Sequence, residues 1–249
     1  MDNGRLRLGS EAYLGVLTHE LQHAIHWNMD PGEEAWVNEG MSEIAQEMTG
    51  NLGQFVTSFL QNPGTQLNNW PDEFSSSGPH YGASTLFFTY LAQRYGGYRG
   101  LKTLIREPAD GIAGVDAYLS SYGASFLEVF KDWVIANYLD SPEGPHGYVD
   151  RTVRVTDVER MSEFGELRST LPQFAARYID LRLEEGDATV SFQGSTEVAQ
   201  VATRCHSGEH CWWGNRGDSI DSTLTRPLDL TGMTEATLEF WAWFEIEED

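Results

Sequence analysis

The sequence predicts an α+β protein with a mostly helical first part, residues 1–170, and a β-rich second part, residues 171–249. Up to about residue 140, apolar residues recur at helical spacing between glycine and proline breaks. After about residue 150, short runs of β-branched and aromatic residues alternate with turn residues, which is typical of an antiparallel β-sandwich. Because the last of these runs reaches the end of the chain, we expect an incomplete, jelly-roll-like sandwich.

The helical part divides into several predicted segments. The first helix begins after Ser10, whose hydroxyl suits an N-cap, and buries an apolar stripe made of Leu14, Leu17, Leu21 and Ile25. A second helix runs from about residue 34 to 48. A loop rich in Pro, Gly, Ser and Asn covers residues 62–79, and further helices cover residues 82–96 and 125–140.

The composition excludes two classes of partner. The 249 residues include 38 acidic and 16 basic side chains, which give a formal net charge of −22. Such a charge repels nucleic acid and anionic membranes, so we expect neither as a partner. No run approaches the roughly 18 apolar residues that span a bilayer, and the first ten residues lack the apolar segment of a signal peptide. An acidic surface that is poor in lysine fits either an extracellular or a high-salt setting, and composition alone does not choose between the two.

The first predicted helix carries the residues of a metal-dependent hydrolase in the order His19-Glu20-Leu21-Gln22-His23. Residues four apart lie on one helical face, so His19 and His23 can bind one metal ion. Glu20 lies beside them, where its carboxylate can take a proton from a metal-activated water. The alternative is a pair of solvent-facing histidines on an ordinary helix.

A catalytic zinc ion needs a third protein ligand and an open position for water. His26 lies on the same face as His19 but roughly 10 Å further along the helix axis, too far for one ion with bonds near ~2 Å. Glu39 is the better third ligand, because a helical hairpin through the Pro31-Gly32 turn returns it to the histidines. Glu43 lies one turn later and can accept a hydrogen bond from a ligand imidazole. The alternative is an ordinary acidic helix surface.

These segments resemble a known group of enzymes. His-Glu-x-x-His followed by Asn-Glu-Gly-x-Ser-Glu is similar to the gluzincin metallopeptidases, the group that contains thermolysin. The string HELQHAIHWN…EEAWVNEGMSEIA is similar to hyicolysin-like and immune inhibitor A-like secreted bacterial peptidases. The string WWGNRGDSIDSTLTRPLDLTGMTEATLEFWAWFEIEED resembles the β-sandwich that follows the catalytic domain in immune inhibitor A-like proteins. The resemblance implies a zincin catalytic portion, secretion, and hydrolysis of protein or peptide substrates by one Zn²⁺. The resemblance also implies three metal ligands, His19, His23 and Glu39. It makes Glu20 the base and Glu43 the outer partner of a ligand imidazole.

The chain also departs from this group. The spacing from His23 to Glu39 is shorter than in thermolysin. The related enzymes place a β-sheet before the active-site helix, and residues 1–10 leave little room for one, so we expect most of that sheet to be missing. A rival hypothesis therefore stays open: a non-catalytic secreted surface or adhesion module, or an inactive fragment that retains a zinc site.

Hydrolysis also needs a hydrogen-bond donor to the oxyanion of the tetrahedral intermediate. In related enzymes a tyrosine or histidine downstream of the third ligand takes this role. The segment Pro79-His80-Tyr81-Gly82 precedes the predicted third helix and supplies both residue types. Tyr81 is our first candidate and His80 our second, with a purely structural role as the alternative for each.

The β-rich part carries two further signals. Cys205 and Cys211 lie close together in CHSGEHC and predict a disulfide across a tight loop in a secreted chain, with a second zinc site through the intervening histidines as the alternative. Asp218 and Asp221 in GDSID could bind calcium together with backbone carbonyls, or form a solvated turn.

Overall fold

The computed structural model describes residues 7–50, 55–71, 73–183, 187–195, 197, 199, 201, 203–215 and 221–244. The chain divides into two compact units, Met1–Val190 and Ser191–Asp249. The first unit is mostly helical with one small sheet, which confirms an α+β protein at this coarse level. The domain boundary near residue 170 stays a prediction. No helix in the described part of the chain has both the length and the apolar character needed to cross a membrane.

The elements of the described residues follow one another in this order: α1 Glu11–Met29, α2 Ala35–Met48, α3 Val56–Gln61, the 3₁₀ helix η1 Phe74–Ser76, α4 Gly78–Arg94, α5 Gly97–Leu104, α6 Gly111–Ser120, α7 Phe126–Leu139, β1 Val158–Met161 and β2 Tyr178–Leu181. The helices predicted near residues 34–48 and 125–140 are confirmed as α2 and α7. Three short helices, α3, α5 and α6, were not predicted individually, because each spans three turns or fewer and shows too little periodicity.

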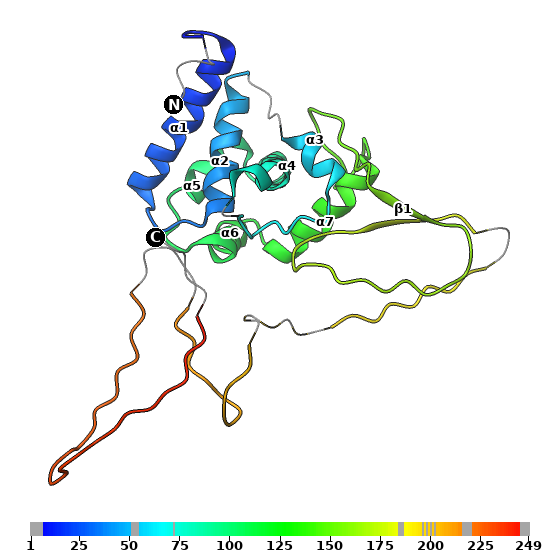
Figure 1. The fold of residues 1–249 in the computed structure, drawn as a ribbon. Coiled ribbons are helices and arrows are strands. Elements are labelled where there is room, and N and C mark those ends of the chain that lie inside the picture. Colours follow the sequence, from blue (N-terminus) through cyan, green and yellow to red (C-terminus); the bar gives the residue numbers. More distant parts are fainter. Residues whose placement is uncertain are drawn as a thin grey trace. The chain divides into compact units, whose positions relative to one another are not determined.

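Helices α1 and α2 form the predicted hairpin and lie side by side (Figure 1). The Ser10 hydroxyl accepts a hydrogen bond from the Tyr13 N–H at 3.3 Å, so the predicted N-cap of α1 is confirmed. At the other end of α1, the Asp30 side chain accepts a hydrogen bond from the Gly32 N–H at 3.3 Å, which stabilises the turn into α2.

The predicted core face of α1 is wrong. The four side chains of its apolar stripe, Leu14, Leu17, Leu21 and Ile25, are between 42% and 57% exposed. The buried residues of α1 are Gly15, Gln22 and His26 instead. Helical spacing shows which side chains share a face, but it does not show which face meets a neighbour. Here α2 packs against the polar side of α1.

Helix α4 is the centre of the core, with every residue from Gly82 to Ala92 buried. It packs against α2, α3, α5 and α7. The contact with α2 is close because Gly40 has no side chain: a Cβ there would lie 2.5 Å from the ring of Phe88 and 3.1 Å from Cβ of Ser84. Trp36 stacks on Phe88 at a centroid distance of 5.5 Å. This packing holds the α2 residues around Gly40 in place.

Helix α4 begins at Gly78, four residues earlier than predicted, and takes in the end of the predicted loop. Pro79 lies in its first turn, where the missing N–H of proline has no helical partner to lose. His80 and Tyr81 therefore belong to the first turn of α4 rather than to the loop before it.

The only sheet in the described residues is the pair β1–β2, in which Val158 lies opposite Tyr178 and Met161 opposite Leu181. The strand β2 lies in the predicted run ARYIDLRL, but its pairing is parallel, whereas we predicted antiparallel strands. The long connection between the two strands permits this arrangement. Tyr178 anchors β2 on the helical core, since its hydroxyl donates a hydrogen bond to the Val134 carbonyl at 2.8 Å.

The described residues of the second unit contain no helix or strand. They include two of the runs from which the sandwich was predicted, LTRPLDL and most of ATLEFWAWFEI. An antiparallel β-sandwich is therefore not seen in the described part of the chain, and this architecture remains a prediction.

Candidate metal centre

Three side chains from α1 and α2 meet at one point. The Nε2 atoms of His19 and His23 lie 3.0 Å apart, and Oε2 of Glu39 lies 3.2 Å from the first and 3.3 Å from the second. These are the three residues that the sequence indicated as metal ligands, and among the described residues they form the one group of this kind that could hold a metal ion. The hairpin explains the convergence, because it sets Glu39 opposite the histidine face of α1.

The spacing of these three atoms fits a tetrahedral ion. Bonds near ~2.0–2.1 Å in tetrahedral geometry place ligand atoms roughly 3.3 Å apart. The observed separations of 3.0–3.3 Å agree with that value. Oε2 of Glu39 is buried and faces Nε2 of both histidines, as expected for an atom that shares a cation with them. Two imidazoles and one carboxylate are a ligand set that Zn²⁺ accepts, with a fourth position left open.

A further contact at Nδ1 orients the imidazole of each histidine ligand. Nδ1 of His19 lies 3.3 Å from a carboxylate oxygen of Glu43, the predicted outer partner. Nδ1 of His23 contacts the side-chain oxygen of Asn38. Because both neighbours are acceptors, each histidine donates its proton from Nδ1 and keeps a lone pair on Nε2, toward the shared point. The surroundings therefore select the tautomer that a metal needs.

The sequence did not reveal Asn38, Ser42 and Gln22 as parts of this site. The buried hydroxyl of Ser42 donates a hydrogen bond to the Gln22 side chain at 2.6 Å and lies 3.0 Å from Nδ1 of His23. Asn38 and Ser42 are four residues apart, so they share one face of α2. The sequence signal for Asn38 and Ser42 was their four-residue spacing, which is the same as that of their neighbours Glu39 and Glu43.

The carboxylates change the proton affinity of the site. Burial lowers the pKa of His19, but hydrogen bonds to Glu39 and Glu43 outweigh it and raise this pKa to about 9. Hydrogen bonding to Glu39 likewise raises the pKa of His23. Burial raises the pKa of Glu39, yet the two histidines lower it overall to about 2. Protons and a metal ion therefore compete for the same nitrogens.

His26, the rejected ligand candidate, is completely buried on α1, and neither of its ring nitrogens has a hydrogen-bond partner among the described residues. It does not belong to the group of converging ligand atoms. Burial lowers the pKa of His26, so its ring is neutral at pH 7. This environment fits the packing role that the sequence suggested.

The predicted catalytic side chains are Glu20, Tyr81 and His80. Glu20 is exposed on α1, and its charge makes a small contribution to the raised pKa of Tyr81. The ring of Tyr81 lies 6.3 Å from that of His19, and Glu39 contributes to the raised pKa of the Tyr81 phenol. Burial, followed by the charge of Glu39, raises the pKa of Tyr81, so the phenol is neutral at pH 7. The ring of His80 instead lies near Trp70, with centroids 5.9 Å apart.

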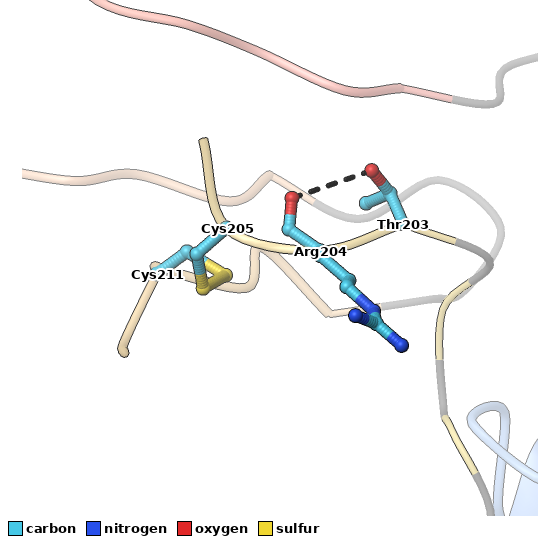
Figure 2. Close-up of a disulfide and its surroundings, with 4 residues drawn as sticks. All are labelled: Thr203, Arg204, Cys205 and Cys211. Carbon is cyan, nitrogen blue, oxygen red and sulfur yellow. Dashed lines mark hydrogen bonds between the residues drawn. A yellow bond between two sulfur atoms is a disulfide. The ribbon is translucent and has the colours of Figure 1, made fainter. Parts of the chain in front are cut away.

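Figure 2 shows the cysteine loop of the second unit, where Cys205 and Cys211 are joined in a disulfide with a Cα–Cα distance of 5.4 Å. The bonded sulfurs are not thiolates, so they offer no ligands for the alternative zinc site. Of the two residues suggested for calcium, Asp218 lies outside the described residues and Asp221 is exposed. The calcium site remains a prediction.

Comparison with known proteins gives one short similarity. No protein-family model matches the chain. Over 42 residues, 17% of the chain, it is 45% identical to the Pre-pro-metalloprotease PrtV of Vibrio cholerae serotype O1, in strain M66-2 and in strain ATCC 39315 / El Tor Inaba N16961. The matched segment is 5% of the length of the Vibrio protein, so the chain spans only a small share of this relative.

Proposed function

We propose that this chain carries the active site of a zinc-dependent metalloendopeptidase. The observation that carries the proposal is the convergence of His19, His23 and Glu39 at tetrahedral spacing, with acceptors behind both imidazoles. The short similarity to a protein named as a metalloprotease supports the same class of reaction. Protein or peptide is therefore the proposed substrate, and Zn²⁺ the proposed cofactor.

His19, His23 and Glu39 would hold the zinc ion, which would supply a Lewis acid that lowers the pKa of a water to about 7. Glu20 lies beside the ligands on an exposed face of α1, where it accepts the proton of the attacking water and passes it to the leaving amine. The neutral phenol of Tyr81 donates a hydrogen bond to the oxyanion, with His80 as the second candidate. Glu43 and Asn38 keep His19 and His23 in orientation during turnover.

The finer assignment belongs to the same proposal. Residues 1–170 form a gluzincin-type catalytic portion of the thermolysin kind, and residues 171–249 form a β-sandwich domain. The protein is secreted, which suits the disulfide between Cys205 and Cys211, because such bonds persist in oxidising compartments. The basis for the zincin assignment is the ligand pattern together with the α1–α2 hairpin.

The test compares Glu20→Gln with Glu11→Gln, a matched change at an exposed glutamate in the first turn of the same helix. Each protein is loaded with zinc, analysed for metal, and assayed on an unfolded protein substrate. Glu20→Gln should lose at least ~10²-fold in rate because the base is gone, and keep its zinc. Glu11→Gln should match wild type. Substantial activity in Glu20→Gln would contradict the mechanism, and zinc binding without hydrolysis by wild type would favour the non-catalytic surface module.

A further inference from the structure

The position of Tyr81 depends on residues outside the metal site. Its ring lies 6.3 Å from that of His19, and the Glu39 carboxylate is near enough to raise the pKa of its phenol. Tyr81 belongs to the first turn of α4, whereas both of these neighbours belong to the α1–α2 hairpin. The phenol thus reaches across from another helix, and its side chain is only half buried. Some other contact must select its rotamer.

Two aromatic side chains supply that contact. The ring of Phe55 stacks on Tyr81 with a centroid distance of 5.0 Å and an interplanar angle of 25°. The ring of Trp70 meets Tyr81 edge-on at 4.8 Å and 84°. Phe55 precedes α3, and Trp70 belongs to the loop before η1. One face and one edge of the phenol are therefore in aromatic contact, which disfavours the other rotamers of Tyr81.

Two glycines on α4 lie against Phe55, and one of them, Gly82, has no room for a side chain there. Gly78 and Gly82 are one turn apart on one face of the helix. A Cβ at Gly82 would overlap the Phe55 carbonyl and lie 2.8 Å from Cβ of Phe59, and a Cβ at Gly78 would lie 3.5 Å from the Phe55 ring. Phe59 is buried and stacks on Trp133 at 5.4 Å, so the core fixes α3 in this position.

We propose that Phe55 and Trp70 are positioning residues that hold the Tyr81 phenol beside the metal ligands. This inference rests on the proposed function, since Tyr81 needs a fixed position only if it stabilises the oxyanion. Neither aromatic residue touches the reacting atoms. They act through Tyr81, and a displacement of about 1 Å at a catalytic group can cost ~10² in rate.

The kinetic test is a double-mutant cycle on a quenched-fluorescent peptide that the zinc-loaded wild-type protein cleaves. Phe55→Ala and Trp70→Ala should each lower kcat by about 10- to 100-fold, with KM and zinc content unchanged. In a Tyr81→Phe background the same changes should lower kcat by no more than about twofold further, because residues that act through one group are not additive. Phe55→Tyr and Trp70→Phe, which keep a ring, should restore most of kcat. Full additivity would overturn the proposal.

A second readout does not depend on activity. The protein is labelled with 3-fluorotyrosine, and the ¹⁹F signal of Tyr81 is identified by its loss in Tyr81→Phe among the 10 tyrosines. Phe55→Ala should shift and sharpen this signal, because the ring current of Phe55 is lost and the phenol gains rotamers. Leu127→Ala is a control at an exposed position on α7 and should leave the signal unchanged. An unchanged signal in Phe55→Ala overturns the proposal. A wild-type protein that cleaves nothing refutes the proposed function, and the ¹⁹F result still decides whether Phe55 and Trp70 hold Tyr81.

Discussion

The two faces of α1 are buried in the opposite way to those of an ordinary amphipathic helix: the polar face is buried and the apolar face is exposed. One face carries His19, Gln22 and His23, which lie toward α2 and are buried or half buried. The other face carries the apolar stripe that includes Leu17 and Leu21, and it is exposed in the described structure. In an ordinary surface helix, the apolar side chains would face the core.

The difference shows what stabilises each face. Burying imidazole and amide groups costs free energy unless they find partners. On the inner face, Asn38, Ser42 and Glu43 of α2 supply those partners, and the Nε2 atoms turn toward a shared metal position. The inner face should therefore respond strongly to changes in polar partners, protons and metal. Shortening an apolar side chain on the outer face should change the stability of the protein only a little.

The largest expected effect is the loss of metal when an inner-face ligand is removed. In His19→Ala, His23→Ala and Glu39→Ala, two of the three ligand atoms remain, so zinc binding should fall to background in elemental analysis after dialysis. His26→Ala is the matched control, because His26 is a histidine of the same helix outside the ligand group. Full zinc retention in Glu39→Ala would refute the ligand assignment and make His26 a candidate again.

The next effect comes from pH. Zinc binds the neutral imidazole, and the pKa of His19 is raised to about 9, so this ring carries a proton from pH 6 to 8 when no metal is bound. Each zinc ion must displace that proton, and the raised pKa of His23 adds to the competition, so the apparent affinity should fall at least about tenfold per pH unit from pH 8 to pH 6. Competition with a chromophoric chelator measures this slope. A zinc affinity that stays constant from pH 8 to pH 6 would contradict the competition between protons and zinc.

Glu43→Gln sharpens the same prediction. The carboxylate of Glu43 helps to raise the pKa of His19. Its removal should lower this pKa from about 9, while Glu39 still raises it, so the fall in affinity near pH 8 should be less steep than in wild type. A slope that is the same as in wild type would show that Glu43 does not control the proton on His19.

A smaller effect is expected at Asn38. Asn38→Ala removes the acceptor that fixes the tautomer of His23 but leaves all three ligands in place. Loss of such an outer partner costs about 10- to 100-fold in metal affinity. The same chelator competition measures it at pH 8, with Asn28→Ala at an exposed position of α1 as the control. Equal affinity of Asn38→Ala and wild type would show that the contact is incidental.

The sequence predicted the ligands well because their geometry is local. His19 and His23 are one turn apart on a helix, and a short turn at Pro31-Gly32 brings Glu39 back to them. The supporting residues were harder to predict, since Asn38 could equally have been a solvated polar side chain on α2. Its role follows only from the packing of α2 on the polar face of α1.

Long-range features could not be predicted from such patterns. The run that contains Tyr178 forms a strand as predicted, but its parallel partner, Val158–Met161, lies in a segment with no strand signal. Which face of α1 meets a neighbour is likewise a property of the tertiary structure. The early start of α4 brings Tyr81 into a helical turn and sets Gly82 against the Phe55 carbonyl, where a Cβ would not fit.

The smallest expected effect is on stability, and it separates the two faces of α1 most directly. Leu21 is more than half exposed, and Leu91 in α4 is fully buried. Leu91→Ala should lower the free energy of unfolding by about 2–5 kcal/mol, because it removes buried methyl groups and leaves a cavity. Leu21→Ala is the same chemical change at an exposed position, and it should cost less than about 0.5 kcal/mol.

Alanine forms helices at least as well as leucine, so helix propensity does not mask this comparison. Urea denaturation followed by circular dichroism measures both variants against wild type. If Leu21→Ala costs as much as Leu91→Ala, the outer face of α1 is covered in solution, and the stripe of Leu14, Leu17, Leu21 and Ile25 is a core face after all. If only Leu91→Ala is destabilising, then the polar contacts with α2 are what hold α1 in place.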